Sequence, residues 1–557
     1  MIEQSGSVSA TATTADPTMR DRHHQPAPGS NGAEHGHAVE EWSSPDPTAL
    51  PWHRRHARDL VGMVLLLASL SFLWGRGRHV WYWIDEGISI GIASQPLARI
   101  PELLAQDGAP PLYYVLLHFW MGAVGTTEAA THLLSLLFAL ATVPAALWAG
   151  WSLFGRRAGW VCAALAALNP YIAYYANETR MYSLVVLVSV LACATFLHAF
   201  VFGRRRYLPA FALALTLGLY SHNWALFLGL ALGAGVVGVA ALAEDRRRVL
   251  LDGVLAFGAV ALAYAPWVPT LLYQMEHSGA PWLRRPTLLG VRADVIALIG
   301  TSEAVAVLAL GLALGFAVLL PWPWPRHAPP ATIAVLAAGA ILAVTVTAGW
   351  VISRQDSVWT FRYLAVAVGP LLILMGAGLA RGGRLATAAL AVYAVFMVPV
   401  GVKGQPDAKS NVRDITEEAA PLLQPGDLVV ASFGRVPVLN QYLPVGLDYA
   451  ETTGAVDAGG GSDQRDPIER LEALAPQETL PPLLDALPSG GRAVVVCPPP
   501  DMLEEDDTEF LTLISERCED ALNLVRDDER FRLDLEVNHR GVSQAPEDGY
   551  LFTKVAP

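Results

Sequence analysis

Charged residues and cysteines are scarce in this sequence. Only 16% of the 557 residues are charged, 53% are hydrophobic, and the mean hydropathy is +0.37. Because the apolar residues form many long runs, this composition indicates a polytopic membrane protein. The sequence also lacks a basic stripe and zinc-ligand spacing, which argues against nucleic acid as a partner.

The four cysteines show no metal-binding pattern. Cys162 and Cys193 lie within apolar runs, where a packing role is expected. Cys497 and Cys518 lie near the C-terminus and would form a disulfide only if that region is outside the cytoplasm. The sequence leaves their pairing open.

Acidic charge is concentrated in the last part of the chain. The net charge is −13, but residues 404–557 contain 30 acidic and 12 basic residues, a net −18, which leaves about +5 for the rest. This division predicts three regions. Residues 1–57 should be a disordered cytoplasmic segment, 58–403 a transmembrane catalytic domain, and 404–557 a small extracytoplasmic α/β domain.

The first apolar run follows a basic flank, so we expect an uncleaved signal anchor and no cleavable signal peptide. Counting this run, eleven apolar segments are long enough, or nearly so, to span a bilayer. They fall near residues 60–75, 131–153, 158–175, 181–202, 207–221, 224–243, 249–272, 304–320, 331–352, 361–380 and 384–402.

Short basic clusters set the expected orientation. With eleven spans they all fall on the side of the basic N-terminal flank, which predicts that this side is the cytoplasm. The clusters are Arg156-Arg157, Arg204–Arg206, Arg246–Arg248, Arg326, and Arg381 with Arg384.

The run at 111–125 is about fifteen residues long and would reverse the later loops if it crossed the membrane, so we expect a helix on the outer face. Arg284, Arg285 and Arg292 lie in an outer loop, against the usual charge bias. They are candidates for binding an anionic ligand.

The C-terminal region has the pattern of a small α/β domain. Residues 427–431 and 492–496 are short apolar strand signals that follow Pro-Gly and Gly-Gly turns. A Gly-rich loop at 454–462 precedes a helical stretch from about Pro467 to Leu474. The Gly-Gly-Gly run lacks phosphate-loop spacing, and 501–507 is expected to be a solvated acidic loop.

Polar residues recur at the ends of the spans on the expected outer side. The first outer segment contains Trp81–Glu86, Asp107 and Pro110–Tyr114. Later outer segments contain Asn169–Tyr182, Tyr220–Trp224, Tyr264–Trp267, Arg354 and Arg362-Tyr363. An Asp-Glu pair alone is equally typical of a solvated loop, and a membrane-interface belt would explain most of the Trp and Tyr. Acidic residues beside apolar spans are costly to desolvate, however, so the combined set indicates a site that opens outward.

The order of these motifs resembles a known family. Asp-Glu, Pro-Pro-Leu-Tyr-Tyr, Glu-x-Arg-Met-Tyr, Tyr-x-His, Pro-Trp and Arg-Tyr-Leu follow one another over about residues 58–405, as in the GT-C membrane glycosyltransferases. Within these, the chain is most similar to bacterial mannosyltransferase-like proteins related to protein O-mannosyltransferases and aminoarabinose transferases. The resemblance implies a polyprenyl-phosphate sugar donor, used at the outer face with inversion at the anomeric carbon.

The resemblance also implies roles for individual residues. The catalytic candidates are Asp85, Glu86 and Glu178, and the substrate-binding candidates are Asp107, Arg180, Tyr182, His222, Arg362 and Tyr363. Asp85 corresponds to the first-loop catalytic carboxylate, and Arg180 and Arg362 to groups that hold the donor phosphate. Relatives often have His where Ala109 stands, which leaves metal dependence open, and we assign no metal site and no cofactor.

We therefore expect an enzyme that transfers mannose or a similar hexose or pentose to a cell-envelope glycan, lipid or protein. A polytopic transporter or flippase of lipids or glycans is the alternative. No internal repeat or midplane charge, which transporters often have, is evident in the sequence. A non-catalytic lipid- or glycan-binding protein, and an enzyme that transfers whole oligosaccharides, also stay open.

Overall fold

The computed structural model describes residues 56–320, 328–403, 409–457, 459–499, 507–539 and 545–555. The predicted disordered region 1–57 lies almost entirely outside these residues, as does the acidic loop expected at 501–507. From Val61 onward the chain forms one compact unit.

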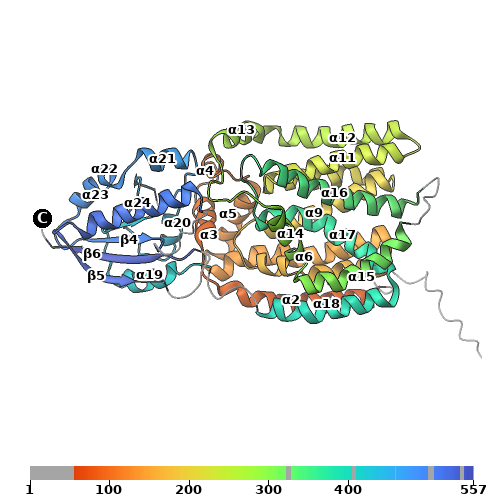
Figure 1. Ribbon diagram of the computed structural model, residues 1–557, viewed down its shortest axis with the longest axis horizontal. Helices are drawn as coiled ribbons and strands as arrows, with labels where there is room; N and C mark the ends of the chain where they lie inside the picture. Colours follow the sequence, from red (N-terminus) through yellow and green to blue (C-terminus); the bar gives the residue numbers. More distant parts are fainter. Residues whose placement is uncertain are drawn as a thin grey trace, which may run out of the picture. The chain divides into compact units, whose positions relative to one another are not determined.

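Long apolar helices make up the first part of this unit and run side by side (Figure 1). Within the described residues, nine helices are long and apolar enough to cross a membrane. They are Ala57–His79, Glu128–Phe154, Tyr182–Val201, Ala225–Leu242, Arg246–His277, Ser302–Leu319, Pro330–Ile352, Phe361–Arg381 and Gly383–Val400. These spans contain, in order, α2 (Ala57–Trp74), α6 (Glu128–Phe154), α9 (Tyr182–Phe196), α11 (Ala225–Leu242), α12 (Arg246–Tyr264) with α13 (Val268–His277), α15 (Ser302–Leu319), α16 (Pro330–Ile352), α17 (Ala365–Arg381) and most of α18 (Gly383–Lys403).

The count of eleven spans was too high by the criterion of length. The expected runs at 158–175 and 207–221 do form helices, but α7 (Arg156–Leu168) has 13 residues and α10 (Leu208–Ser221) has 14. Asn169 ends α7 early because its side chain caps the next helix, α8 (Pro170–Tyr175), by accepting from the Ile172 amide. Residues 111–125 form α5 (Leu112–Val124), also 13 residues and thus short for a span.

Small residues allow the central helices to approach closely. A Cβ added at Gly369 of α17 would lie 2.4 Å from the backbone of Ser189 in α9, and one added at Gly376 would lie 2.1 Å from Cys162 Sγ in α7. Close backbone contact at small residues is a common source of helix association in membranes. The two free cysteines are buried in this packing, as expected.

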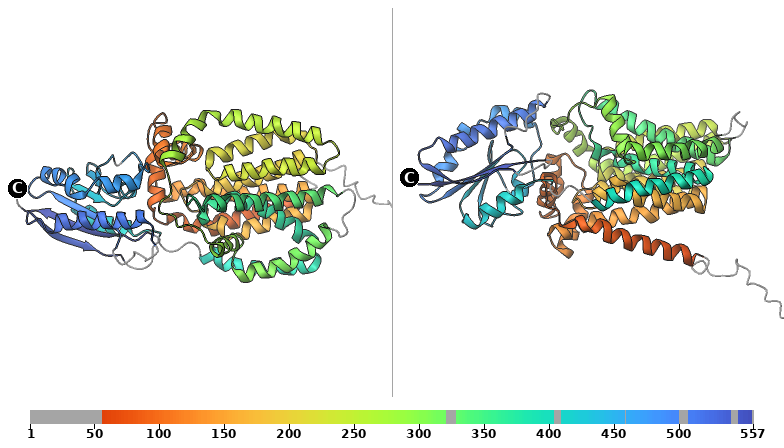
Figure 2. Two further views of the ribbon diagram at one scale, coloured as in Figure 1. Left: turned by 45° about the horizontal axis from the view of Figure 1, so that its top comes forward. Right: turned by 60° about the horizontal axis from the view of Figure 1, so that its bottom comes forward.

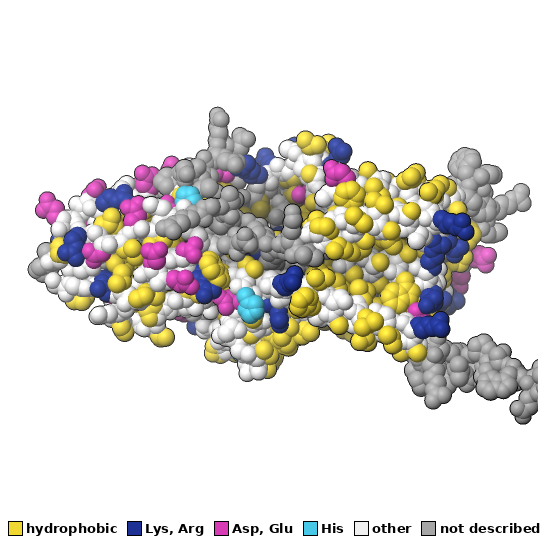
Figure 3. Space-filling model, turned by 90° about the horizontal axis from the view of Figure 1, so that it is seen from below, with side chains coloured by type: hydrophobic (Ala, Val, Ile, Leu, Met, Phe, Trp, Pro, Cys, Tyr) yellow, Lys and Arg dark blue, Asp and Glu magenta, His cyan; other side chains and the backbone are white. Residues whose placement is uncertain are grey.

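The surface of the bundle agrees with a membrane location. On the face seen in Figure 3, apolar side chains cover the bundle and basic side chains gather at one end of the apolar band. Basic clusters stand where α7 and α12 begin and where α17 ends. The chain is a multi-pass membrane protein, and the orientation of its ends in the cell stays a prediction.

Short helices lie at the opposite ends of the long ones. The segment after α2 folds into α3 (Ile84–Ala93), α4 (Ile100–Asp107) and α5, which Figure 1 shows grouped together. The later connections contain α8, α14 (Leu288–Ala297) and the 3-10 turn Phe361–Leu364 that precedes α17.

The C-terminal region is a mixed α/β domain, as predicted. Its six-stranded sheet has the order β3-β2-β1-β4-β6-β5, with β1, β2 and β4 parallel and the others antiparallel. The strands are β1 (Leu428–Ala431), β2 (Asp448–Glu451), β3 (Gly454–Ala455), β4 (Arg492–Cys497), β5 (Phe531–Val537) and β6 (Asp548–Lys554). The helices are α19 (Val412–Ala419), α20 (Val436–Leu439), α21 (Pro467–Ala473), α22 (Pro476–Thr479), α23 (Pro481–Ala486) and α24 (Glu509–Arg526).

The two central strands β1 and β4 are buried on both faces of the sheet, whereas the edge strand β5 is largely exposed. Val430 and Val495 pack on the side of α24, whereas Val429 and Val494 share the other core with Ile415 of α19. Figure 2 shows α24 and α19 on opposite sides of the strands. Burial on two faces explains the continuous apolar runs of β1 and β4.

Three local predictions for this domain are confirmed, namely the two strands β1 and β4 and the helix α21. In addition, Cys497 and Cys518, whose pairing the sequence left open, form a disulfide between β4 and α24.

The C-terminal domain contacts the short helices directly. Val438 of α20 lies against Gly87 of α3, where an added Cβ would come within 2.5 Å of the Val438 Cα. The Tyr442 hydroxyl accepts from the Tyr82 amide at 2.8 Å. Arg284, a proposed anion ligand, instead pairs with Asp507 at 2.7 Å. The domain is thereby docked on the helix that begins with the Asp-Glu pair.

Candidate active site

Asp85 lies in the first turn of α3, where the helix dipole favours a carboxylate. Arg362 Nη1 donates to its Oδ2 at 2.7 Å, and Arg180 Nη2 lies 3.9 Å from the same oxygen. Burial by itself would raise the pKa of Asp85, but the two guanidinium groups outweigh it and hold the pKa below its ordinary value. Asp85 is therefore ionised at neutral pH.

Arg180 is fixed by contacts to three neighbours. Its Nη1 donates to the Ser89 hydroxyl at 3.0 Å, to the Tyr114 hydroxyl at 3.3 Å and to the Asp85 carbonyl at 3.3 Å. Its buried Nε has no partner among the described residues, and the same is true of Nε in Arg362. Both arginines therefore keep a donor for a further acceptor.

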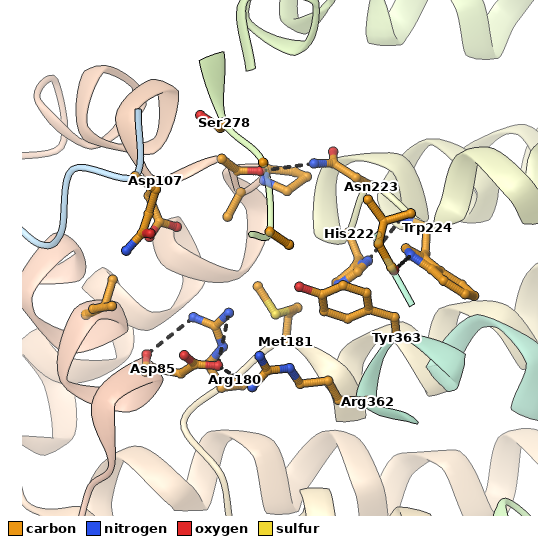
Figure 4. A pocket seen from close by; sticks show the side chains of 18 of the residues that line it. Asp85, Asp107, Arg180, Met181, His222, Asn223, Trp224, Ser278, Arg362 and Tyr363 are labelled. Carbon is orange, nitrogen blue, oxygen red and sulfur yellow. Dashed lines mark hydrogen bonds and ion pairs between the residues drawn. The ribbon is translucent and has the colours of Figure 1, made fainter. Parts of the chain in front are cut away.

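These groups face a cavity of about 200 Å³ (Figure 4). Six of the nine candidate site residues line it, namely Asp85, Asp107, Arg180, His222, Arg362 and Tyr363. We call it the arginine cavity. Its remaining wall includes Asn223, Trp224, Ser278, Trp282 and, from the C-terminal domain, Gln464. The loop of Gln464 is held by a hydrogen bond of 3.0 Å that the backbone amide of Gln464 donates to the backbone carbonyl of Gln106.

Asp107 contributes a second carboxylate to this cavity from the last residue of α4. The chain turns immediately afterwards at Gly108, whose positive φ of 89° suits glycine. The Tyr114 hydroxyl donates to Asp107 Oδ2 at 3.3 Å. Burial raises the pKa of Asp107 to about 6, with Arg180 opposing the rise and Asp85 adding to it.

His222 lies at the end of α10, facing Tyr363 at a ring-centroid distance of 4.7 Å. Its Nδ1 accepts from the Trp224 amide at 3.1 Å. Burial, together with the positive charges of Arg180 and Arg362, lowers the pKa of His222 to about 3. The imidazole is therefore neutral at neutral pH, with its remaining proton on Nε2, and it can donate one hydrogen bond but cannot act as a cation.

Glu86 points away from the arginine cavity and is almost fully buried. Its Oε1 accepts from the Thr179 amide at 2.6 Å and lies 2.7 Å from His132 Nε2. Burial alone would raise the pKa of Glu86, but His132 and Lys409 hold it below its ordinary value. These contacts tie α3 to α6 and to the segment before α9.

Glu178 and Tyr182 also lie outside the arginine cavity. Glu178 Oε2 accepts from Lys409 Nζ at 2.8 Å, and both side chains are buried. Burial alone would lower the pKa of Lys409, but Glu178 and Glu86 outweigh it and keep the ammonium charged. Tyr182 is buried in an aromatic cluster with Tyr175, 4.8 Å away between centroids.

Sequence reasoning missed two residues of these networks. Lys409 is one of only three lysines in the sequence, so its rarity was a usable signal. His132 was a polar residue at the start of an apolar run, which is costly in a membrane unless it is paired. Neither signal identifies a partner, because Glu178 and Glu86 are 231 and 46 residues away in the chain.

No group of three or more His, Cys, Asp or Glu side chains suited to a metal ion occurs in the part of the chain that the structure describes. Metal dependence stays open.

The architecture defines the class of protein: a polytopic helical membrane protein with a C-terminal mixed α/β domain. The sequence matches no protein-family model and no curated protein. Among solved structures, the chain is similar to ArnT from Cupriavidus metallidurans bound to undecaprenyl phosphate, with a TM-score of 0.57 and 16% identity over 88% of this chain and 97% of that one. It is also similar to the arabinofuranosyltransferase AftD from mycobacteria, with a TM-score of 0.51 and 15% identity over 92% of this chain and 40% of that one.

These similarities concern the fold. They confirm the predicted GT-C-like architecture, whereas the narrower mannosyltransferase-like family has no support from them.

Proposed function

We propose that this protein is a membrane glycosyltransferase that takes a sugar from a polyprenyl-phosphate donor and transfers it to a glycan, lipid or protein of the cell envelope. The observation that carries the proposal is the arginine cavity, in which two arginines and two carboxylates meet beside apolar helices. A solved structure of the same fold, ArnT, holds undecaprenyl phosphate.

The arginines suit the phosphate of the donor. Arg180 and Arg362 both pair with Asp85, and each has an Nε–H that finds no partner within the described part of the chain. A phosphate oxygen accepts well from such donors, and two guanidinium groups offset the charge that develops as the phosphate leaves. A neutral His222 can add one further hydrogen bond.

Asp85 is the proposed base. An acceptor oxygen attacks the anomeric carbon, a bond to that carbon forms, and the bond from the carbon to the phosphate oxygen breaks. The proton of the acceptor passes to Asp85, and polyprenyl phosphate leaves with the bonding electrons. This single displacement inverts the anomeric carbon. Donor phosphate takes up part of the arginines' charge, so Asp85 becomes a stronger base once the donor is bound.

Asp107 has the proposed role of orienting the transferred sugar. It is partly exposed to the arginine cavity, and its Tyr114 contact leaves acceptor capacity for sugar hydroxyls. Glu86 and Glu178 have the proposed role of positioning α3 and the loop of Arg180. We thereby replace the catalytic roles expected for these two glutamates.

An extracytoplasmic location of this site and of the C-terminal domain is part of the proposal. The basic clusters at the starts of α7 and α12 support it through the positive-inside rule. The Cys497–Cys518 disulfide also supports it, because such bonds persist in oxidising compartments.

The test is release of lipid phosphate by purified protein in detergent. A panel of undecaprenyl-phosphate sugars, including mannosyl, arabinofuranosyl and aminoarabinosyl donors, is supplied with extracted cell-envelope glycans. Consumption of one donor with matching glycosylation of an acceptor supports the proposal. Binding of several donors without consumption by any of them contradicts it and favours a transporter or a binding protein.

A further inference from the structure

A second cavity, of about 380 Å³, lies beside the arginine cavity. It is lined by Trp83, Tyr174, Tyr175, Glu178, Thr360, Phe361 and Arg362. Arg362 is the one described residue that lines both cavities. We call it the aromatic cavity because four of its seven lining residues are aromatic. The proposed reaction uses none of these aromatic side chains.

Two polar groups of the aromatic cavity are left without partners. Trp83 Nε1 is a buried donor, and Glu178 Oε1 is a buried acceptor, and neither has a hydrogen-bond partner among the described residues. The Glu178 side chain is only 2% exposed. Its other oxygen is already occupied by Lys409 at 2.8 Å. Buried polar groups of this kind are normally satisfied by a bound molecule or by water.

The mixture of donor and acceptor restricts what can bind. An isoprenoid chain would satisfy neither group. A phosphate could accept from Trp83 but would meet the carboxylate of Glu178 with like charge. A hydroxyl group both donates and accepts, so a polyhydroxylated ring can satisfy both groups at once. Aromatic side chains such as Trp83 and Tyr174 also suit the apolar faces of a sugar ring.

The charge around the cavity favours a neutral ligand. Lys409 Nζ lies 5.9 Å from the Trp83 ring centroid and 4.9 Å from that of Tyr174, and its charge is balanced by Glu178. The guanidinium of Arg362 lies 5.4 Å from the centroid of Trp83 and is balanced by Asp85. Both cations beside the aromatic cavity thus have a carboxylate partner among the described residues.

We infer that the aromatic cavity is the subsite for the acceptor, and that it binds a neutral sugar ring of the acceptor glycan through Trp83, Glu178 and Thr360. This inference rests on the proposed function. That function assigns the donor to the arginine cavity, so a sugar bound in the aromatic cavity would be the acceptor. Because Arg362 borders both cavities, a donor phosphate and an acceptor sugar would contact the same guanidinium. Lys409, from the segment that leads into the C-terminal domain, would hold Glu178 in place for this sugar.

Sugar binding can be measured without turnover. The protein is placed in lipid nanodiscs, and saturation-transfer NMR is recorded with methyl α-mannopyranoside, methyl α-arabinofuranoside and methyl β-galactofuranoside as probes. Trp83→Phe removes the indole N–H but keeps an aromatic ring, and Thr360→Val removes the hydroxyl at nearly constant shape. Trp267→Phe is the matched control, because the buried Nε1 of Trp267 also has no partner in the part of the chain that the structure describes, and this residue lines neither cavity.

We expect the wild type and Trp267→Phe to bind at least one glycoside equally well. Trp83→Phe and Thr360→Val should each weaken that binding at least fivefold, and binding of undecaprenyl phosphate should be unchanged in both. Equal sugar binding by Trp83→Phe, Thr360→Val and wild type overturns the inference, as does absence of sugar binding by the wild type. Failure of the proposed function is a separate result, namely no release of lipid phosphate by a wild type that binds both ligands.

Discussion

Arg362 donates to Asp85 across 2.7 Å and so joins the 3-10 turn before α17 to the first turn of α3, although the two residues are 277 positions apart in the chain. Arg180 approaches the same carboxylate oxygen from a third segment. The candidate site is therefore assembled from parts of the sequence that only the fold brings together.

Replacing Arg362 by Lys should impair donor use. A lysine keeps the charge but loses the planar fork that can hold Asp85 and a phosphate together. We expect kcat/KM for the donor to fall roughly 10- to 100-fold, because one charge-assisted hydrogen bond is lost. Steady-state release of lipid phosphate measures this. Arg99→Lys is the control, since Arg99 makes a partly exposed pair with Asp457, and it should behave as wild type.

Activity should decline in mild acid because of Asp107. Its pKa is raised to about 6, so the carboxylate takes up a proton as the pH falls through 6. If Asp107 must be ionised to orient the sugar, kcat/KM should drop about tenfold per pH unit below that value. A pH–rate profile of Asp107→Asn should lack this limb. An unchanged acidic limb in the variant would assign it to another group.

The buried Lys409–Glu178 pair should matter for stability. Lys409→Met leaves the carboxylate of Glu178 buried without its partner, which typically costs about 3–5 kcal/mol. Thermal unfolding in detergent should therefore occur at a clearly lower temperature. Adding Glu178→Gln to Lys409→Met removes the stranded charge and should recover part of the loss. A double variant no more stable than Lys409→Met would mean that the pair is not coupled.

The close contact between Gly87 and Val438 should be sensitive to a single methyl group. Gly87→Ala would place its Cβ 2.5 Å from the Val438 Cα, so either α3 or the C-terminal domain must shift. Since α3 carries Asp85, we expect turnover to fall at least tenfold through misplacement of the carboxylate. Gly122→Ala in α5 has open space around it and is the control. Normal turnover by Gly87→Ala would show that docking of the domain does not position Asp85.

Much of the fold could be predicted from the sequence, because the length of the apolar runs and the positions of turn residues determine where its helices and strands lie. The helical bundle, β1, β4 and α21 follow directly from such runs. The two errors have different causes. The helix α7 is shorter than its apolar run because Asn169 ends it, whereas α10 fills nearly the whole run at 207–221, which is itself short for a span. Other signals were present but overlooked. The alternation in Phe531–Val537 is a strand pattern, and α24 has apolar residues at helical spacing.

The candidate site was predictable in its members but not in its arrangement. The order of the motifs identified Asp85, Arg180 and Arg362 as candidates, and in the structure these three residues line one cavity. The separation of Glu86 and Glu178 from them could not be read from the sequence, because it depends on the partners His132 and Lys409. Distances across hundreds of residues are set by packing, which no local pattern records.

The most direct test of the account is the release of undecaprenyl phosphate by purified wild type and by Asp85→Asn, measured with the same donor and acceptor. The amide keeps the shape of the side chain but cannot accept the proton from the acceptor. We predict release by the wild type and a loss of at least a hundredfold in the variant, with donor binding retained. Release by Asp85→Asn at the wild-type rate would contradict the proposed role of Asp85.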